Sequence, residues 1–93
     1  MQTYVILRRS AWEDEQELDA AAALSGRVED EEMSDQVRWI RSYVLDEEDG
    51  TLGTVCIYQA VDDDAIMEHA QKAEIPVDEV IPVTNTVVVR DDP

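Results

Sequence analysis

The fold is decided by residues 39–76, which read WIRSYVLDEEDGTLGTVCIYQAVDDDAIMEHAQKAEIP. Two parts of it, WIRSYV and CIYQA, alternate between two sets of side chains, as strands do because successive residues point to opposite faces. Asp49 and Gly50 mark a hairpin connection between these parts. After the aspartates at 62–64, apolar residues recur at helical spacing until Pro76. The segment therefore predicts two antiparallel strands followed by a short amphipathic helix.

The flanking residues add one strand and one helix before this segment and one strand after it. We predict strands over residues 4–8, 37–45, 54–60 and 80–90, and helices over residues 11–30 and 63–73. Ser10 and Glu13 are spaced as a capping box that would start the first helix. Pro82 favours a sheet edge for the last strand, because proline has no N–H for a central ladder. We expect one domain over residues 1–93, with an ordered core over 1–90 and a polar tail over 91–93.

The order βαββαβ with right-handed crossovers predicts an α+β fold of the ferredoxin-like type. Its four-stranded antiparallel sheet would have the strand order 4-1-3-2, with two helices on one face. The other face would then lack a cover, and a second copy of the chain is the most economical one. We therefore expect a homodimer that forms through the helix-free sheet face.

The chain is strongly acidic, with 23 acidic against 7 basic residues and a formal net charge of -16. The acids, the single lysine Lys72 and the absence of phenylalanine resemble the composition of haloarchaeal cytoplasmic proteins. A surface that captures a basic partner or a metal is the alternative reading of the acids. Binding to nucleic acid phosphates or to anionic membranes would need a basic face, so neither class of partner is expected. No apolar run is long enough for a membrane span, and we expect a cytoplasmic protein.

Several of these segments together resemble the small nickel-binding ferredoxin-like proteins of bacteria and archaea. The matching positions are Tyr4, Val5, Ile6, Arg8, Trp39, Ser42, Tyr43, Val44, Cys56, Tyr58, Ala60, Ala65, Ile66, Glu68, His69, Ala70, Ala73, Pro76 and Asp78. The resemblance implies a ferredoxin-like dimer with metal-binding capacity. Leu7 departs from the family pattern, which has a glutamate there, and this removes one possible metal ligand.

His69 is the only histidine and the first candidate for chemistry. A neutral imidazole is a good ligand for nickel or another divalent transition metal, and carboxylates of Glu68, Asp64 or a partner subunit could complete the shell. The alternative is a structural histidine, hydrogen-bonded to a strand tyrosine or a backbone carbonyl. Cys56 is alone, so it forms no internal disulfide and is expected to be a buried apolar residue.

A second candidate site combines Tyr43, Tyr58 and Arg41, in which phenols and a guanidinium could orient a small planar or anionic ligand. Alternation along residues 37–45 places Arg41, Tyr43 and Trp39 on one face of the strand. Packing at a core or interface is the alternative. Five arginines lie on or beside strands, and they either pair with acidic helices and loops or form an anion site at the strand ends.

Three functional hypotheses follow. The first is a dimeric, metal-binding or metal-responsive accessory protein with His69 as ligand. The second is a small-molecule enzyme of the dimeric ferredoxin-like class, and the third is a plain dimerisation module. A binding role is favoured over an enzyme, because the sequence contains none of the common motifs for nucleophilic, phosphate-binding or zinc-dependent catalysis.

Overall fold

The structure is a computed structural model that describes residues 1–92. These residues form β1 (Gln2–Trp12), α1 (Glu15–Glu32), β2 (Val37–Asp46), β3 (Leu52–Ala60), α2 (Asp63–Lys72) and β4 (Glu79–Pro82). Within them, neither helix is long and apolar enough to cross a membrane. The predicted tail reaches Pro93, which lies outside the described residues.

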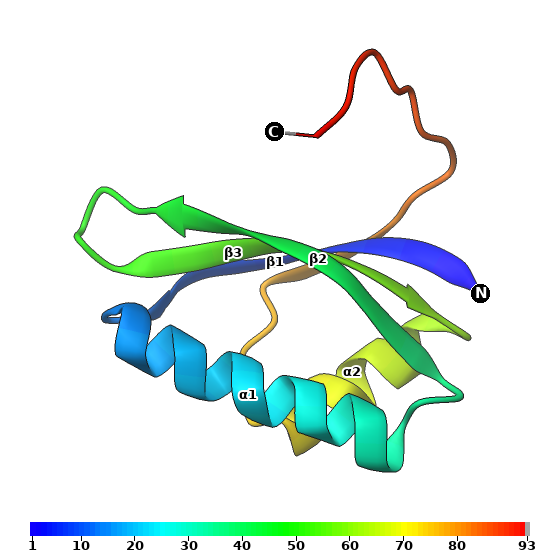
Figure 1. The fold of residues 1–93 in the computed structure, drawn as a ribbon, viewed down its shortest axis with the longest axis horizontal. Coiled ribbons are helices and arrows are strands. Elements are labelled where there is room, and N and C mark those ends of the chain that lie inside the picture. The colour runs from blue at the N-terminus through cyan, green and yellow to red at the C-terminus, as the bar shows by residue number, and fades with distance from the viewer. Residues whose placement is uncertain (93) are drawn as a thin grey trace.

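The four strands form one sheet in the order β2-β3-β1-β4, and each neighbouring pair is antiparallel. Both helices lie on the same side of this sheet (Figure 1). The predicted ferredoxin-like α+β fold, with the strand order 4-1-3-2, is confirmed. Pro82 ends β4 at an edge of the sheet, where its missing N–H leaves no gap in a central ladder.

The core lies between the helices and the inward-facing residues of the two central strands. Along β1, burial alternates, so that Tyr4, Ile6 and Arg8 all point toward the helices. Their partners on β3 are Tyr58, Cys56 and Thr54, which are buried as well. The helices complete this layer with Ser25 and Val28 from α1 and with Ala65, Ile66, His69 and Ala70 from α2.

The first helix begins later than predicted, because β1 continues to Trp12. Asp14 caps α1 by accepting a hydrogen bond from the backbone N–H of Glu17 at 2.9 Å. The capping box predicted at Ser10 is therefore wrong. The pairing of β1 with β3 shifts register between Arg8 and Trp12, and Ser10 has a positive φ of 48° within this irregularity.

A second irregularity lies within β2 and reverses the alternation of its side chains between the two sheet faces. The register shifts between Trp39, which lies opposite Tyr58, and Arg41, which lies opposite Ile57. One extra residue in a strand moves every following side chain to the other face. Trp39 therefore faces the helices, whereas Arg41 and Tyr43 face away from them, and the prediction that the three share one face is wrong.

The last strand is much shorter than the predicted 80–90. Only Glu79–Pro82 pairs with β1, and the chain beyond it leaves the sheet. Figure 1 shows this final segment, in orange and red, rising on the side of the sheet that carries no helix. Asp92 there accepts a hydrogen bond from the Tyr43 hydroxyl and forms an ion pair with Arg41.

Candidate functional site

A cavity lies under α1, between this helix and the inward face of the sheet. Its volume is about 190 Å³. Both tryptophans of the chain, Trp12 and Trp39, line it, together with Leu18 and small residues of α1. Beside Leu18, α1 contributes Ala21 and Ala22, whose small side chains leave part of this space open. The cavity is therefore walled mainly by apolar groups.

A charged residue lines this cavity. Arg8 is only 1% exposed, and its Nη1 donates a hydrogen bond to Cys56 Sγ at 3.1 Å. Its guanidinium carbon lies 6.0 Å from the centre of the Tyr58 ring, within reach of a cation–π contact. The Nε and Nη2 atoms of Arg8 have no hydrogen-bond partner among residues 1–92. A guanidinium stays charged at any physiological pH, so this is a buried cation with two unused donors.

The Cys56 thiol connects Arg8 to a chain of polar groups along the cavity wall. Trp39 Nε1 donates to Ser42 Oγ at 2.8 Å, and Ser42 Oγ donates to Cys56 Sγ at 3.0 Å. The thiol in turn donates to Thr54 Oγ1 at 3.4 Å. Cys56 is buried as expected, and it also accepts hydrogen bonds from two neighbours in addition to filling apolar space.

A second polar chain joins the sheet to both helices. The hydroxyls of Tyr58 and Ser25 share a hydrogen bond of 3.2 Å, and His69 Nε2 lies 3.0 Å from the Ser25 carbonyl oxygen. A carbonyl only accepts, so Nε2 carries the proton. Burial lowers the pKa of His69 and raises the pKa of Tyr58 to about 12. Both groups are therefore neutral near pH 7 and act as hydrogen-bonding groups of the core.

The structure brings together two of the residues singled out from the sequence. The rings of Tyr58 and His69 lie 5.5 Å apart between centroids, so the imidazole does sit beside a strand tyrosine. Arg41 and Tyr43 lie on the opposite sheet face, since they follow the shift in β2. The three side chains proposed as one pocket, Tyr43, Tyr58 and Arg41, therefore do not converge within one subunit.

The residues predicted as metal ligands are also separated. Asp64 and Glu68 lie one turn apart on an exposed groove of α2, whereas His69 is 1% exposed and faces Ser25. Glu68 lies 3.7 Å from the Lys72 ammonium. Nowhere in residues 1–92 do three His, Cys, Asp or Glu side chains group as a metal site. The described arrangement does not fit a single-subunit site built from His69, Glu68 and Asp64.

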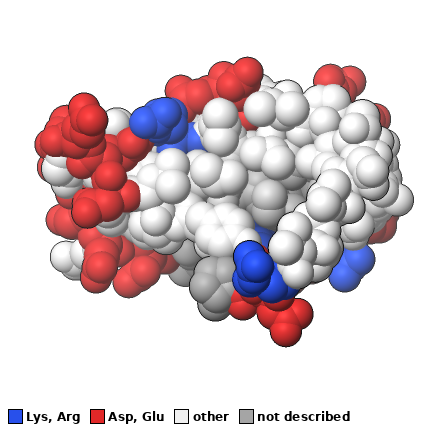
Figure 2. Space-filling model, turned by 90° about the horizontal axis from the view of Figure 1, so that it is seen from above, with Lys and Arg blue, Asp and Glu red and all other residues white. Residues whose placement is uncertain are grey.

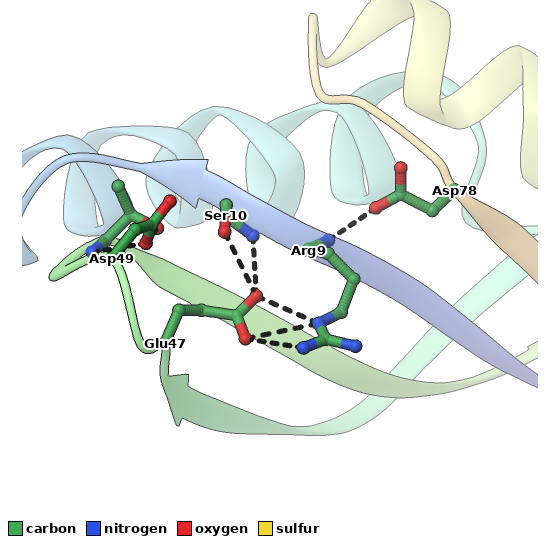
Figure 3. Close-up of polar contacts among 6 residues, drawn as sticks. Arg9, Ser10, Glu47, Asp49 and Asp78 are labelled. Atoms are coloured by element: carbon green, nitrogen blue, oxygen red, sulfur yellow. Dashed lines mark hydrogen bonds and ion pairs between the residues drawn. The ribbon is translucent and has the colours of Figure 1, made fainter.

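A surface cluster at the hairpin end of the sheet shows how this protein pairs an arginine with a carboxylate (Figure 3). Arg9 donates from Nε and Nη2 to the two carboxylate oxygens of Glu47, at 2.9 and 2.8 Å. The backbone N–H of Ser10 donates to the same carboxylate at 2.7 Å. The hydrogen bonds from Arg9 and Ser10 lower the pKa of Glu47. This ion pair agrees with the expectation that arginines tie acidic loops to the sheet.

Sequence reasoning missed the buried role of Arg8. The prediction groups Arg8 with the other strand arginines, although one signal distinguishes it. Arg8 shares its parity with Tyr4 and Ile6, and alternate residues of a strand face the same side. The same parity places Arg9 on the other face, where the structure shows it exposed and paired with Glu47.

Comparison with known proteins agrees with this fold and adds a family. A family described as "Nickel responsive protein SCO4226-like" matches residues 4–83. Among solved structures, SCO4226 from Streptomyces coelicolor A3(2) superposes with a TM-score of 0.71 at 14% sequence identity, over 91% of this chain and 99% of that one. At this identity the likeness shows the fold alone. No curated protein sequence matches. Because the family pattern spans most of the sequence, the chain belongs to the SCO4226-like family of nickel-responsive proteins.

Proposed function

We propose that this chain is a nickel-binding, nickel-responsive protein that works as a homodimer and carries out no catalysis of its own. The observation that carries the proposal is the family match over residues 4–83, whose description names nickel responsiveness. The acidic surface supports it, because carboxylate oxygens bind divalent cations such as nickel. A metal that occupied His69 Nε2 would have to displace the Ser25 carbonyl from it.

The direct test is calorimetric titration of the metal-free protein with nickel in molar potassium chloride. Two variants separate the candidate ligands: His69→Gln removes the imidazole, and the double variant Asp64→Asn with Glu68→Gln removes the exposed carboxylates. If His69 is a ligand, the first variant loses nickel binding and the second keeps part of it. If the α2 carboxylates hold the metal, the order reverses. Absence of any saturable heat in the unmodified protein would remove the proposal.

The dimer proposal rests on the helix-free face of the sheet. Figure 2 shows this face with few charged residues over its centre and with acidic residues gathered toward its rim. Val5, Ile57 and Val55 are half-buried there, and Ile81 is still 39% exposed. An apolar patch of this kind on a strongly acidic protein supports the proposal that this face associates with a partner. A second copy would bury the patch against an identical one by a two-fold axis.

Sedimentation in molar potassium chloride tests the dimer with a matched pair of variants. Ile81→Asp places a charge on the helix-free face, whereas Val61→Asp places the same charge at an exposed site, 53% accessible, after β3. We expect Ile81→Asp to be a monomer and Val61→Asp to remain a dimer. A monomeric unmodified protein, or a dimer that survives Ile81→Asp unchanged, contradicts this interface.

A further inference from the structure

We propose that the cavity under α1 binds a small organic monocarboxylate, whose two oxygens pair with Nε and Nη2 of Arg8. The apolar part of this ligand would pack against Trp12 and Trp39. This inference does not depend on the nickel proposal, since it concerns the inward face of the sheet and neither the α2 groove nor the helix-free face.

The first argument is the uncompensated charge of Arg8. Its side chain is 1% exposed, and it forms no ion pair with any carboxylate of residues 1–92. Buried charges in proteins are normally paired, because an isolated one is costly to take out of water. The Glu29 carboxylate accepts a hydrogen bond from the backbone N–H of Trp39 and forms no ion pair with Arg8. An anion from outside the chain would give this buried guanidinium the partner that no carboxylate of residues 1–92 supplies.

The second argument is the geometry of the unused donors. Nε and Nη2 lie on one edge of a guanidinium, and this edge matches the two oxygens of a carboxylate. The next residue shows the match within this protein, because Arg9 uses these same two atoms to hold Glu47 at 2.9 and 2.8 Å (Figure 3). On Arg8, Nη1 is occupied by Cys56 and only this edge has no partner among the described atoms.

The third argument is the size and lining of the cavity. A volume of about 190 Å³ exceeds the roughly 150 Å³ of an engineered cavity that binds benzene, so a six-membered ring with one carboxylate is of suitable size. Within the described part of the chain, Arg8 is the one cationic residue of the lining, and Asp19 is the one anionic residue. A dianion such as phosphate would find no second cation here. A monocarboxylate with an apolar ring or branched body fits this lining best.

The two tryptophans of the lining supply the assay, because no tryptophan lies elsewhere in the chain. We would titrate the full protein with cyclohexanecarboxylate, which is transparent where tryptophan is excited, and follow tryptophan emission at one fixed potassium chloride concentration. Cyclohexanecarboxamide is the matched neutral ligand. Arg8→Met removes the buried guanidinium, and Arg9→Met removes the exposed guanidinium next to it. Arg8→Lys keeps the charge but loses the two-donor edge.

We expect saturable binding of the carboxylate, and binding at least about tenfold weaker for the amide, because the amide lacks the charge-assisted pair. Arg8→Met should lower the affinity for the carboxylate by a similar factor, and Arg9→Met should leave it within about twofold. Should Arg8→Met fail to fold, Arg8→Lys is the deciding variant and should also weaken binding. Equal affinities for acid and amide, equal affinities of the Arg8 variants and the unmodified protein, or no saturable change at all would overturn the proposal.

Discussion

Arg8→Met is expected to stabilise the ligand-free protein, although it removes a buried side chain. The guanidinium leaves two donors, Nε and Nη2, without partners, and each unpaired buried donor costs about 1–3 kcal/mol. The substitution also loses the hydrogen bond to Cys56 and the contact with the Tyr58 ring, each worth about 1 kcal/mol. Methionine has a similar length and no polar group to satisfy. The free energy of unfolding should therefore rise by up to about 4 kcal/mol, as for other buried charges replaced by apolar residues.

Urea unfolding at one fixed, molar potassium chloride concentration measures this change, with tryptophan emission or circular dichroism as the signal. Thermal unfolding offers a second measure, since about 4–8 °C in Tm corresponds to each kcal/mol for a domain of this size. The control is Arg9→Met, because Arg9 is exposed and its pair with Glu47 is a surface ion pair worth about 0–1 kcal/mol. A loss of more than about 1 kcal/mol in Arg8→Met, relative to Arg9→Met, would refute the reasoning. Arg8 would then be compensated in the free protein, and the case for an external carboxylate would weaken with it.

Three further predictions concern the glycines, the imidazole and the acidic surface. Gly53→Ala should destabilise the protein by about 1–3 kcal/mol, because a Cβ there would lie 2.7 Å from the Arg8 carbonyl oxygen and 2.8 Å from Glu47 Oε2. Gly26→Ala, where a Cβ meets nothing within 4 Å, should stabilise α1 by about 0.5–1 kcal/mol, and urea unfolding that ranks the two alanines in the reverse order would contradict both. Burial lowers the pKa of His69 in the folded state below its ordinary value of 6.5. The neutral imidazole therefore contributes its full stability above pH 6.5, and this contribution is lost as the pH falls from 6.5 through the lower, folded-state pKa. The difference between unmodified protein and His69→Gln should then carry a slope of up to about 1.4 kcal/mol per pH unit below pH ~6.5, and parallel stability curves would exclude a buried neutral imidazole. Finally, the melting temperature should rise from dilute buffer to molar potassium chloride, because the Debye length falls from ~10 Å at 0.1 M to ~3 Å at 1 M and the acidic residues then repel one another less. A melting temperature that does not change with salt would mean that self-repulsion at a net charge of -16 does not limit the stability of the fold.

The fold could be predicted because several independent signals agree on it. The turn at Asp49 and Gly50, the aspartates before α2 and the position of Pro82 each follow from backbone chemistry that holds in any context. What could not be predicted are the two register shifts, after Arg8 and after Trp39. A bulge inserts one residue without a turn residue or a break in hydrophobicity to mark it. In β2 the one extra residue changes which way the following side chains point, and hence the candidate site, while the strand order stays the same.

The candidate site shows the same limit at the level of single residues. Tyr58 lies on β3, which has no inserted residue in its pairing with β2, and it faces the helices beside His69. Arg41 and Tyr43 lie after the shift in β2, so alternation placed them on the wrong face. Arg8 could have been found by parity with Ile6, but an arginine in a core position contradicts its usual place at the surface. A charged residue in the core breaks the rule that charges lie at the surface, and such exceptions are expected at functional sites.

The two proposed binding surfaces use opposite faces of one strand, and this makes them separable by experiment. In β3, Cys56 and Tyr58 face the cavity and Arg8, whereas Val55 and Ile57 face the proposed dimer interface. The sheet lies between the two surfaces, so a charge introduced at Ile81 is remote from the tryptophans that report on the cavity. If monomeric Ile81→Asp binds cyclohexanecarboxylate as the dimer does, the cavity is complete within one subunit. If the monomeric variant binds cyclohexanecarboxylate more weakly than the dimer does, the interface fixes the position of the strands that line the cavity. Ligand binding by Arg8 would then depend on a second copy of the chain.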